Sequence, residues 1–380
     1  MNRKIRVMHF VESLGAGGME NGIVNLANHF DRSRFDYMIC CFGQPGAMAQ
    51  RLDAVNTPLY ALNYGDGFHF SSVLSLGRFL RKQRIDILHT HGWGSRCFIG
   101  LVAAKIARIP LCINGEHGQL HIEKTGRFLA QRVILPLYDD NLSVSEDLKY
   151  KIRRELRLPR LPVTVITNGV DTEKFHGKYN VDQLRATLKL EANDLAIGVI
   201  ASLKWQKNQQ VVLQAAHRLS SHGKRIRVIF VGDGPDRQML AKMAADLSID
   251  RNTVFLGIRS DVPQILSLLD IMILPSVPNS EGLSNVILEA MASGVPVIAT
   301  NSLGTGDIIQ EEITGMLFDP QDPAELARKI ALIDGDSDLR QRVVGNAKER
   351  ILKDYSLNVM VKRYEDYYLD LFNKAHRKDR

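Results

Sequence analysis

The chain alternates short apolar runs with stretches of helical spacing, and this alternation restricts the possible folds more than any other feature. Apolar runs such as 5–11 and 195–201 are each followed by a turn and then by a stretch whose apolar residues recur every three or four positions. Regular strand–helix alternation predicts parallel, doubly wound sheets that bind ligands at the carboxyl ends of their strands. The pattern stops at a polar connector, 172–180, and then restarts. With 380 residues the chain is long enough for two such domains.

The stretch 271–300 reads as strand, loop, helix and strand. Ser284 is a favourable N-cap for the helix, and Glu281 and Glu289 lie on either side of the helix start. Unpaired backbone N–H groups and the helix dipole favour an anion at such a terminus. The two carboxylates suit sugar or ribose hydroxyls rather than phosphate, although either glutamate could also be a solvated charge. Together these features favour a pocket for a sugar joined to a phosphate.

A glycine-rich turn, 13–20, follows the first predicted strand and precedes a helical pattern. Such turns cradle phosphate groups in many folds. The dinucleotide-binding fingerprint would need a third glycine where this chain has Glu20. A nicotinamide-dependent enzyme is therefore disfavoured.

The positive charge is concentrated in the first part of the chain. The formal charge is +7, and residues 1–170 hold 22 lysines and arginines against 14 aspartates and glutamates. Lys149, Arg153 and Arg157 recur at helical spacing within this part. A basic surface attracts an anionic membrane leaflet or nucleic acid, or is simply a solvated face. Of these partners we expect an anionic membrane surface and no nucleic acid.

The remaining composition bears on location. No apolar run approaches the roughly 18 residues of a membrane span, and the amino-terminal apolar run is too short for a signal peptide. The four cysteines show no metal-ligand spacing. Reduced cysteines are typical of the cytoplasm. We therefore expect a cytoplasmic protein whose contact with the inner face of a membrane, if it exists, is peripheral.

Glu281 and Glu289, separated by seven residues, and the segment 289–299, Glu-Ala-Met-Ala-Ser-Gly-Val-Pro-Val-Ile-Ala, resemble the retaining glycosyltransferases of family 4. The turn with Gly17 and Gly18 resembles the family's amino-terminal loop. The resemblance extends over nearly the whole chain. It implies a GT-B architecture, in which two Rossmann-like domains face each other across a cleft. The implied domains are an acceptor-side domain at 1–170, a nucleotide-sugar donor domain at 171–356, and a last helix at 357–380 that returns to the first domain.

The same resemblance implies roles for individual residues. The expected catalytic residues are His117, Lys207 and Glu281. The family also places an arginine where this chain has Ser202, and a hydroxyl cannot replace a guanidinium fork, although Lys204 is near enough to compensate. Glu20 and Asn21 are the expected acceptor-binding residues. The expected donor-binding residues are Gly17, Gly18, Ser202, Lys207, Arg259, Gly282, Leu283, Ser284 and Glu289.

The histidines raise the alternative of a zinc site. His89, His91, His117 and His121 lie close in sequence, but no carboxylate or cysteine completes a recognisable ligand spacing. We therefore expect no metal and no other cofactor.

The predicted function is a retaining, metal-independent transfer of a sugar from a nucleotide-diphosphate sugar, UDP favoured over GDP, to a hydroxyl acceptor. The acceptor is expected to be a lipid-linked or growing glycan in polysaccharide synthesis. Two alternatives are another GT-B enzyme, such as an epimerase or phosphorylase, and a non-catalytic binder of nucleotide sugars.

Overall fold

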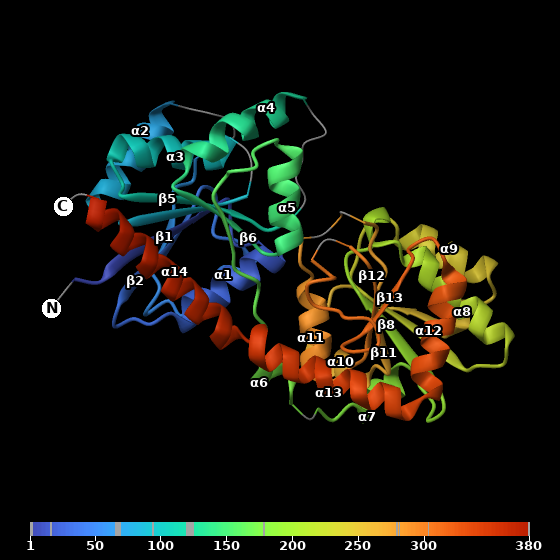
Figure 1. Ribbon diagram of the computed structural model, residues 1–380. Helices are drawn as coiled ribbons and strands as arrows, with labels where there is room; N and C mark the ends of the chain where they lie inside the picture. The colour runs from blue at the N-terminus through green and yellow to red at the C-terminus, as the bar shows by residue number, and fades with distance from the viewer. Residues whose placement is uncertain are drawn as a thin grey trace. The chain divides into compact units, whose positions relative to one another are not determined.

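The protein folds into two compact units, seen in a computed structural model (Figure 1). The described residues are 3–15, 17–64, 70–92, 95–118, 125–177, 179–278, 280, 282–302 and 304–378. The first unit comprises Met1–Gly169 together with Leu357–Arg380, and the second comprises Val170–Ser356. The sequence predicts boundaries after residues 170 and 356. In the structure the first boundary lies one residue earlier, after Gly169, and the second follows Ser356.

The first unit is built on a seven-stranded parallel sheet with the order β3-β2-β1-β4-β5-β6-β7. Its strands are β1 (Ile5–Val11), β2 (Phe35–Cys41), β3 (Leu59–Ala61), β4 (Ile87–His91), β5 (Leu111–Glu116), β6 (Asp140–Ser143) and β7 (Val163–Val165). Both neighbours of β1 are parallel to it, and nearly all residues of β1 are buried. Burial on both faces explains why this strand reads as a continuous apolar run.

Helices cover both faces of this sheet. They are α1 (Gly18–His29), α2 (Phe70–Lys82), α3 (Ser95–Ala107), α4 (Thr125–Ile134), α5 (Glu146–Glu155) and α14 (Leu357–Lys378), with the short 3₁₀ turns η1 (Ala47–Arg51) and η2 (Leu135–Leu137). Alternate residues of β1 point to opposite faces, so Val7 packs in one core with α1 and α14, whereas Phe10 faces α3 at Gly100. Helix α14 lies across the strands in Figure 1 and completes that first core.

The second unit repeats the architecture around a six-stranded parallel sheet with the order β10-β9-β8-β11-β12-β13. Its strands are β8 (Leu195–Ile200), β9 (Ile226–Val231), β10 (Thr253–Phe255), β11 (Ile271–Leu274), β12 (Val297–Thr300) and β13 (Met316–Phe318). Strand order reverses on either side of β8, which is the point where doubly wound sheets place ligands at the strands' carboxyl ends.

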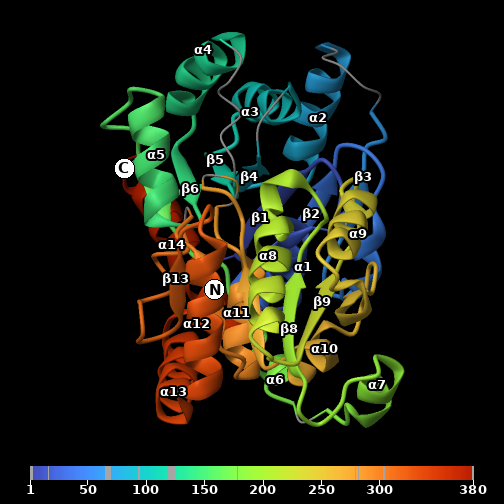
Figure 2. The ribbon, with the colours of Figure 1, turned by 90° about the vertical axis from the view of Figure 1, so that its right-hand side faces the viewer.

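Helices also surround the second sheet. They are α6 (Thr172–Phe175), α7 (Asp182–Thr187), α8 (Gln209–Ser221), α9 (Arg237–Asp246), α10 (Val262–Leu268), α11 (Asn285–Ser293), α12 (Pro323–Gly335) and α13 (Ser337–Asp354), with η3 (Trp205–Lys207) and η4 (Asp250–Asn252). Figure 2 shows α8 lying along β8, and α8 and α12 share one buried apolar core with the sheet. Two parallel-sheet, Rossmann-like units confirm the predicted fold class.

Two local features differ from the sequence predictions. The connector predicted to be polar contains α6, whose Phe175 is buried. Helix α5 ends at Glu155, so Arg157 lies beyond the helix, in a left-handed conformation with φ of 53°, and does not continue the predicted basic face. Asp336 caps α13, because its carboxylate accepts hydrogen bonds from the N–H groups of Asp338 and Leu339.

Candidate active site

The predicted donor-binding residues of the second unit follow the carboxyl ends of neighbouring strands. Ser202 and Lys207 follow β8, Arg259 follows β10, and Gly282–Ser284 follow β11. Because these strands are parallel, their loops emerge at the same edge of the sheet. The sequence prediction therefore selects one edge of one sheet, although the residues are spread over 80 positions.

The loop that carries Lys207 is tied to the loop that follows β11. The carbonyl of Gln206 accepts a hydrogen bond from the Val277 N–H at 2.9 Å and one from the Ser280 hydroxyl at 3.4 Å. The next residue, Asn208, is left-handed with φ of 47° and donates its side-chain amide to a backbone carbonyl at 2.9 Å. Lys207 is half-buried between these constraints. The cation is thus carried by a loop of defined conformation.

Helix α11 begins after Ser284, which has an extended conformation suited to an N-cap. The Ser284 hydroxyl makes no capping hydrogen bond, so the prediction of the helix start is correct and that of side-chain capping is not. Gly282 and Leu283 are buried, and Glu289 is half-buried one turn into the helix. The helix is followed by Gly294, which is left-handed with φ of 78° and serves as its C-cap. Glu281 lies outside the described residues.

Arg259 already has a partner. Its guanidinium donates to both carboxylate oxygens of Asp261, at 2.8 and 2.6 Å. These hydrogen bonds raise the pKa of Arg259 and lower the pKa of Asp261. A bound phosphate would have to share this guanidinium with Asp261.

In the first unit, Gly17 is the N-cap of α1, and Gly18 is its first residue. A side chain at Gly17 would overlap the carboxylate of Glu20, which therefore folds back over the start of the helix. Burial raises the pKa of Glu20. The Asn21 side-chain oxygen accepts a hydrogen bond from Arg51 at 2.6 Å. The two expected acceptor-binding residues thus lie on one helical turn, each constrained by a neighbour.

His117, just after β5, belongs to a cluster of histidines. Its Nε2 lies 2.8 Å from Nδ1 of His91, and Nε2 of His91 lies 2.8 Å from Nδ1 of His9. His89 stacks on His91 with a centroid separation of 4.2 Å. Burial lowers the pKa of His117 to about 4 and lowers the pKa of the other three well below the usual value. All four imidazoles are therefore neutral at neutral pH.

Two members of this arrangement were missed from the sequence. His9 occupies a position of β1 that faces α14, and the Tyr368 hydroxyl from α14 bonds both His9 and His89. The i, i+2 spacing of His89 and His91 did indicate a shared face. Nothing in the local sequence pairs that face with a tyrosine more than 270 residues away.

The histidine cluster also contains the residues that could bind a metal ion. Nitrogen atoms of His9, His89 and His91 lie within 4.8 Å of one another. Neutral imidazoles are zinc ligands, but the nitrogens of a tetrahedral site with 2.0–2.1 Å bonds are roughly 3.3 Å apart. Because His9 and His91 already share a hydrogen bond of 2.8 Å, these two rings would have to separate before both could bind one ion. His121, part of the alternative zinc set, lies outside the described residues.

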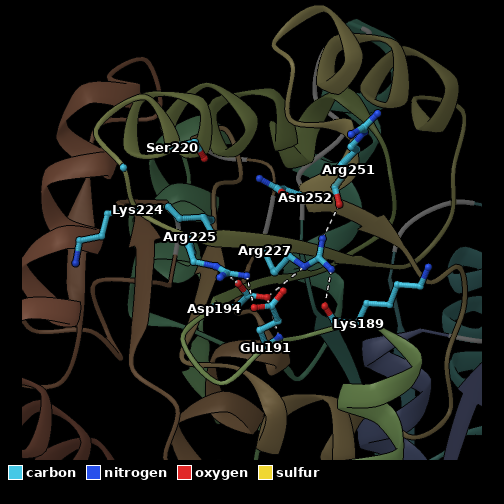
Figure 3. Close-up of a pocket in the computed structure, with 11 residues that line it drawn as sticks. Lys189, Glu191, Asp194, Ser220, Lys224, Arg225, Arg227, Arg251 and Asn252 are labelled. Atoms are coloured by element: carbon cyan, nitrogen blue, oxygen red, sulfur yellow. Dashed lines mark hydrogen bonds and ion pairs between the residues drawn. The ribbon is translucent and has the colours of Figure 1, made fainter.

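A pocket lies at the opposite edge of the second sheet, where its strands begin. Figure 3 shows this pocket of about 380 Å³, lined by residues that precede or begin β8, β9 and β10. Arg225 pairs with Glu191 at 2.6 Å and with Asp194 at 3.1 Å. Arg227 donates to the backbone carbonyls of Leu188, Lys189 and Arg251. The guanidinium groups are engaged within the protein and lie at the strands' amino ends. This pocket does not coincide with the candidate site.

Comparison with known families covers most of the chain. Residues 16–174 match the model for Glycosyltransferase Family 4, and residues 180–350 match the model for Glycosyl transferases group 1. The chain belongs to these glycosyltransferase families. The first match contains Gly17 through His117, and the second contains every predicted donor-binding residue of the second unit.

Individual relatives of these glycosyltransferases span the full length. The UDP-Gal:α-D-GlcNAc-diphosphoundecaprenol α-1,3-galactosyltransferase of Escherichia coli is 26% identical, over 97% of each chain. Among solved structures, a glycosyltransferase from Rickettsia africae superposes with a TM-score of 0.87 at 20% identity, covering 97% of this chain and 99% of that one. Anabaena Alr3699/HepE in complex with UDP superposes with a TM-score of 0.83 at 21% identity, covering 96% and 100%. These structural matches establish a GT-B fold.

Among the residues that the structure describes, no helix of this glycosyltransferase is both long and apolar enough to span a bilayer.

Proposed function

We propose that the protein is a retaining glycosyltransferase that transfers a sugar from a UDP-sugar to a hydroxyl of a lipid-linked or growing glycan. The observation that carries this proposal is the hydrogen-bonded link between the Lys207 loop and the loop leading into α11. It holds a cation and a helix amino terminus at one edge of the second sheet. The name of the E. coli relative, which includes a UDP-sugar and a diphosphoundecaprenol-linked acceptor, supports the donor and acceptor classes.

The departing diphosphate would be bound by three kinds of donor. Lys207 supplies a charge, Ser202 supplies a hydroxyl, and the backbone N–H groups of Leu283 and Ser284 supply the start of α11. Arg259 would reach a phosphate only by sharing its guanidinium with Asp261. Preorganised donors of this kind stabilise charge that develops in the transition state. Gly17 and Gly18 at the start of α1 would provide a second set of backbone donors.

The sugar and ribose would be held by carboxylates and by a neutral imidazole. Glu281 would accept from sugar hydroxyls, Glu289 from ribose hydroxyls, and His117 would hydrogen-bond the sugar through Nδ1. The bond between the anomeric carbon and the phosphate oxygen breaks, and the acceptor oxygen bonds to the same face of the carbon. The released phosphate oxygen takes the acceptor's proton, which explains why no separate general base is assigned. Glu20 and Asn21 would contact the acceptor.

A donor screen tests this function directly. UDP-sugars are expected to raise the melting temperature more than GDP-sugars do, because a ligand that binds only the folded state stabilises it. Incubation with the stabilising donor and an alcohol acceptor should then yield a product with the donor's anomeric configuration. An inverted product would contradict retention. Stabilisation without turnover on any acceptor would favour a non-catalytic binder, and interconversion of donor sugars would favour an epimerase.

The same assay tests the proposed independence from metal. With Lys207 and the backbone donors of α11 in place of a divalent ion, product formation should continue in excess EDTA. Loss of activity in EDTA that Mn²⁺ or Zn²⁺ restores would contradict the proposal and would direct attention to His9, His89 and His91.

We further propose that the protein works at the inner face of a membrane. Helix α4 and the turn after it expose Leu129, Val133 and Leu137, each more than half accessible. Arg132, on the same helix, and Arg157, beyond α5, are also exposed. Two other cations of the predicted basic face are engaged, since Lys149 pairs with Glu146 at 3.0 Å and Arg153 donates to the Leu161 carbonyl. Contact with lipid would therefore combine exposed apolar side chains with fewer charges than the sequence suggested.

Sedimentation with phosphatidylglycerol vesicles is expected to pellet the protein at about 50 mM salt and to leave much of it in solution at about 500 mM. The Debye length shortens roughly threefold between these conditions, and each cation near an anionic leaflet contributes about 1 kcal/mol. Vesicles of phosphatidylcholine are the control for charge. If nothing pellets with phosphatidylglycerol at low salt, the basic surface is a solvated face and the acceptor is a soluble one.

A further inference from the structure

A continuous chain of hydrogen bonds connects helix α14 with His117 inside the first unit. The Tyr368 hydroxyl lies 2.8 Å from Nε2 of His9 and 2.7 Å from Nδ1 of His89. From His9 the chain continues through His91 to His117, with 2.8 Å between ring nitrogens at each step. Tyr368, His9 and His89 have no exposed surface. The hydrogen-bond chain is therefore closed to water where Tyr368 joins His9 and His89.

Strand register and one glycine create this chain. His9 and His89 are directly paired between β1 and β4, and His91 lies two residues further along the same face, opposite Gly115 of β5. A Cβ atom on Gly115 would lie 2.7 Å from Nε2 of His89, 3.0 Å from Nδ1 of His91 and 3.2 Å from Nε2 of His117. Only a residue without a side chain leaves room for three imidazoles at this point.

The number of hydrogens on each ring restricts the tautomers that the four histidines can adopt together. A neutral imidazole carries one N–H, so the nitrogen that donates forces the other nitrogen to accept. If His117 donates from Nε2, His91 must donate from Nε2 to His9, His9 from Nε2 to Tyr368, and Tyr368 to Nδ1 of His89. Reversing the direction makes every ring donate from Nδ1. In both cases His89 carries the same tautomer as the other three.

We propose that His9, His89, His91 and His117 share one tautomer, and that Tyr368 is the positioning residue that couples His89 to the other three. If Tyr368 instead accepted from both His9 and His89, its own hydrogen would have no acceptor among the described residues that contact it. The four rings and the hydroxyl carry five polar hydrogens for four hydrogen bonds, so one donor lacks an acceptor in every arrangement. The coupled arrangements place that donor at an end of the hydrogen-bond chain rather than on the enclosed Tyr368 hydroxyl. Their hydrogen bonds also run in one direction and so strengthen one another, which favours these arrangements.

The shared tautomer affects the candidate site through the two ends of the hydrogen-bond chain, His117 and His89. Nδ1 of His117 and Nε2 of His89 are buried and have no hydrogen-bond partner among the residues that the structure describes. In one arrangement His117 Nδ1 is an acceptor, and in the other it is a donor. A sugar hydroxyl that hydrogen-bonds His117 therefore selects the tautomer of all four rings. The role of His117 toward a sugar rests on the proposed function, whereas the coupling of the tautomers does not.

Imidazole tautomers are measured directly by two-bond ¹H–¹⁵N correlation spectra of histidine-¹⁵N-labelled protein at pH 7.5. The four buried rings, assigned through their contacts with Tyr37 and Tyr368, are expected to be neutral and to show the same tautomer. Opposite tautomers within the set, or a charged ring, would overturn the inference. Stoichiometric zinc in the purified protein that is lost on His89→Asn substitution would also overturn it. The wild-type spectrum decides without any variant.

Tyr368→Phe removes the hydroxyl and keeps the aromatic ring. The variant is expected to release the His89 tautomer from the other three and to lower kcat for sugar transfer by about 3- to 10-fold, the scale of one buried hydrogen bond, with little change in the donor KM. Tyr367→Phe is the matched control, because it removes a neighbouring hydroxyl of α14 that bonds Asp140 at 3.0 Å. It should leave the four tautomers and kcat unchanged.

The tautomer spectrum tests the coupling of the histidines, and the sugar-transfer assay tests the proposed function, so the two proposals can fail separately. A shared tautomer in a protein that transfers no sugar supports the coupling and contradicts the proposed function. Sugar transfer by a protein whose four rings differ in tautomer supports the function and overturns the coupling. Equal tautomer patterns in the Tyr368→Phe variant and the wild type would remove Tyr368 from its assigned role.

Discussion

Replacing Lys207 with alanine is expected to lower the turnover of sugar transfer by about 10- to 1000-fold while the protein remains folded. Loss of one preorganised contact to developing charge has this magnitude in other enzymes. Lys207 is half-buried in a loop whose neighbouring residues, Gln206 and Asn208, are fixed by hydrogen bonds, so the loop holds the lysine in a defined position. The measurement is kcat with the donor that the thermal screen identifies, together with the far-UV circular dichroism of both proteins. Glu281→Ala should reduce turnover on the same scale.

Two control variants sharpen this test. Lys242→Ala removes an exposed lysine from α9 in the same unit and should leave kcat unchanged. Lys204→Ala removes the exposed lysine that could compensate for Ser202, and a loss comparable with that of Lys207→Ala would assign Lys204 to the diphosphate. Normal turnover in both Lys207→Ala and Glu281→Ala would remove this edge of the sheet from the mechanism.

Substituting Gly304 with alanine is expected to destabilise the second unit by about 1–3 kcal/mol and to weaken donor binding at the same time. Gly304 is left-handed with φ of 74°, where a side chain is strained, and an added Cβ atom would overlap the carbonyl oxygen of Gly282. Relief of that overlap displaces Gly282 and Leu283, the residues that lead into α11. Urea unfolding and donor affinity measured on the same preparation report the two effects.

Gly345→Ala is the matched control for this substitution. Gly345 lies within α13, has no atom within 4 Å of an added Cβ, and is expected to gain about 0.5–1 kcal/mol from the higher helix propensity of alanine. Normal donor binding by a destabilised Gly304→Ala protein would show that the Gly282–Leu283 backbone does not hold the donor.

Where local pattern alone determines an element, the sequence was sufficient to predict it. Strand β1 has the predicted bounds and β8 ends one residue before the predicted run does, because continuous apolar runs flanked by turn residues are characteristic of buried strands in parallel sheets. The edge strands β3 and β13, of three residues each, were not predicted. Arg157 was placed on a helix from spacing alone, and the structure ends α5 two residues earlier.

The same distinction between local pattern and tertiary contact applies to the candidate site. The start of α11 and the loop of Lys207 could be predicted because each follows a predictable strand and parallel strands present their loops at one edge. The Arg259–Asp261 pair and the return of Glu20 over Gly17 depend on side-chain conformations that spacing does not specify. The link between Tyr368 and His9 joins residues 359 positions apart, so only the folded chain brings them together.

The position of α14 in the sequence also bears on how the protein is made. Tyr364 and Tyr368 belong to the core of the first unit, although the whole second unit separates them from the strands that they cover. A ribosome releases β1 first and α14 last, and domains generally fold as units. The second unit, a single continuous segment, is therefore the first to have its complete core available. Until α14 emerges, α1 covers this apolar sheet face only in part, and the remaining exposed surface is of the kind that chaperones bind during synthesis.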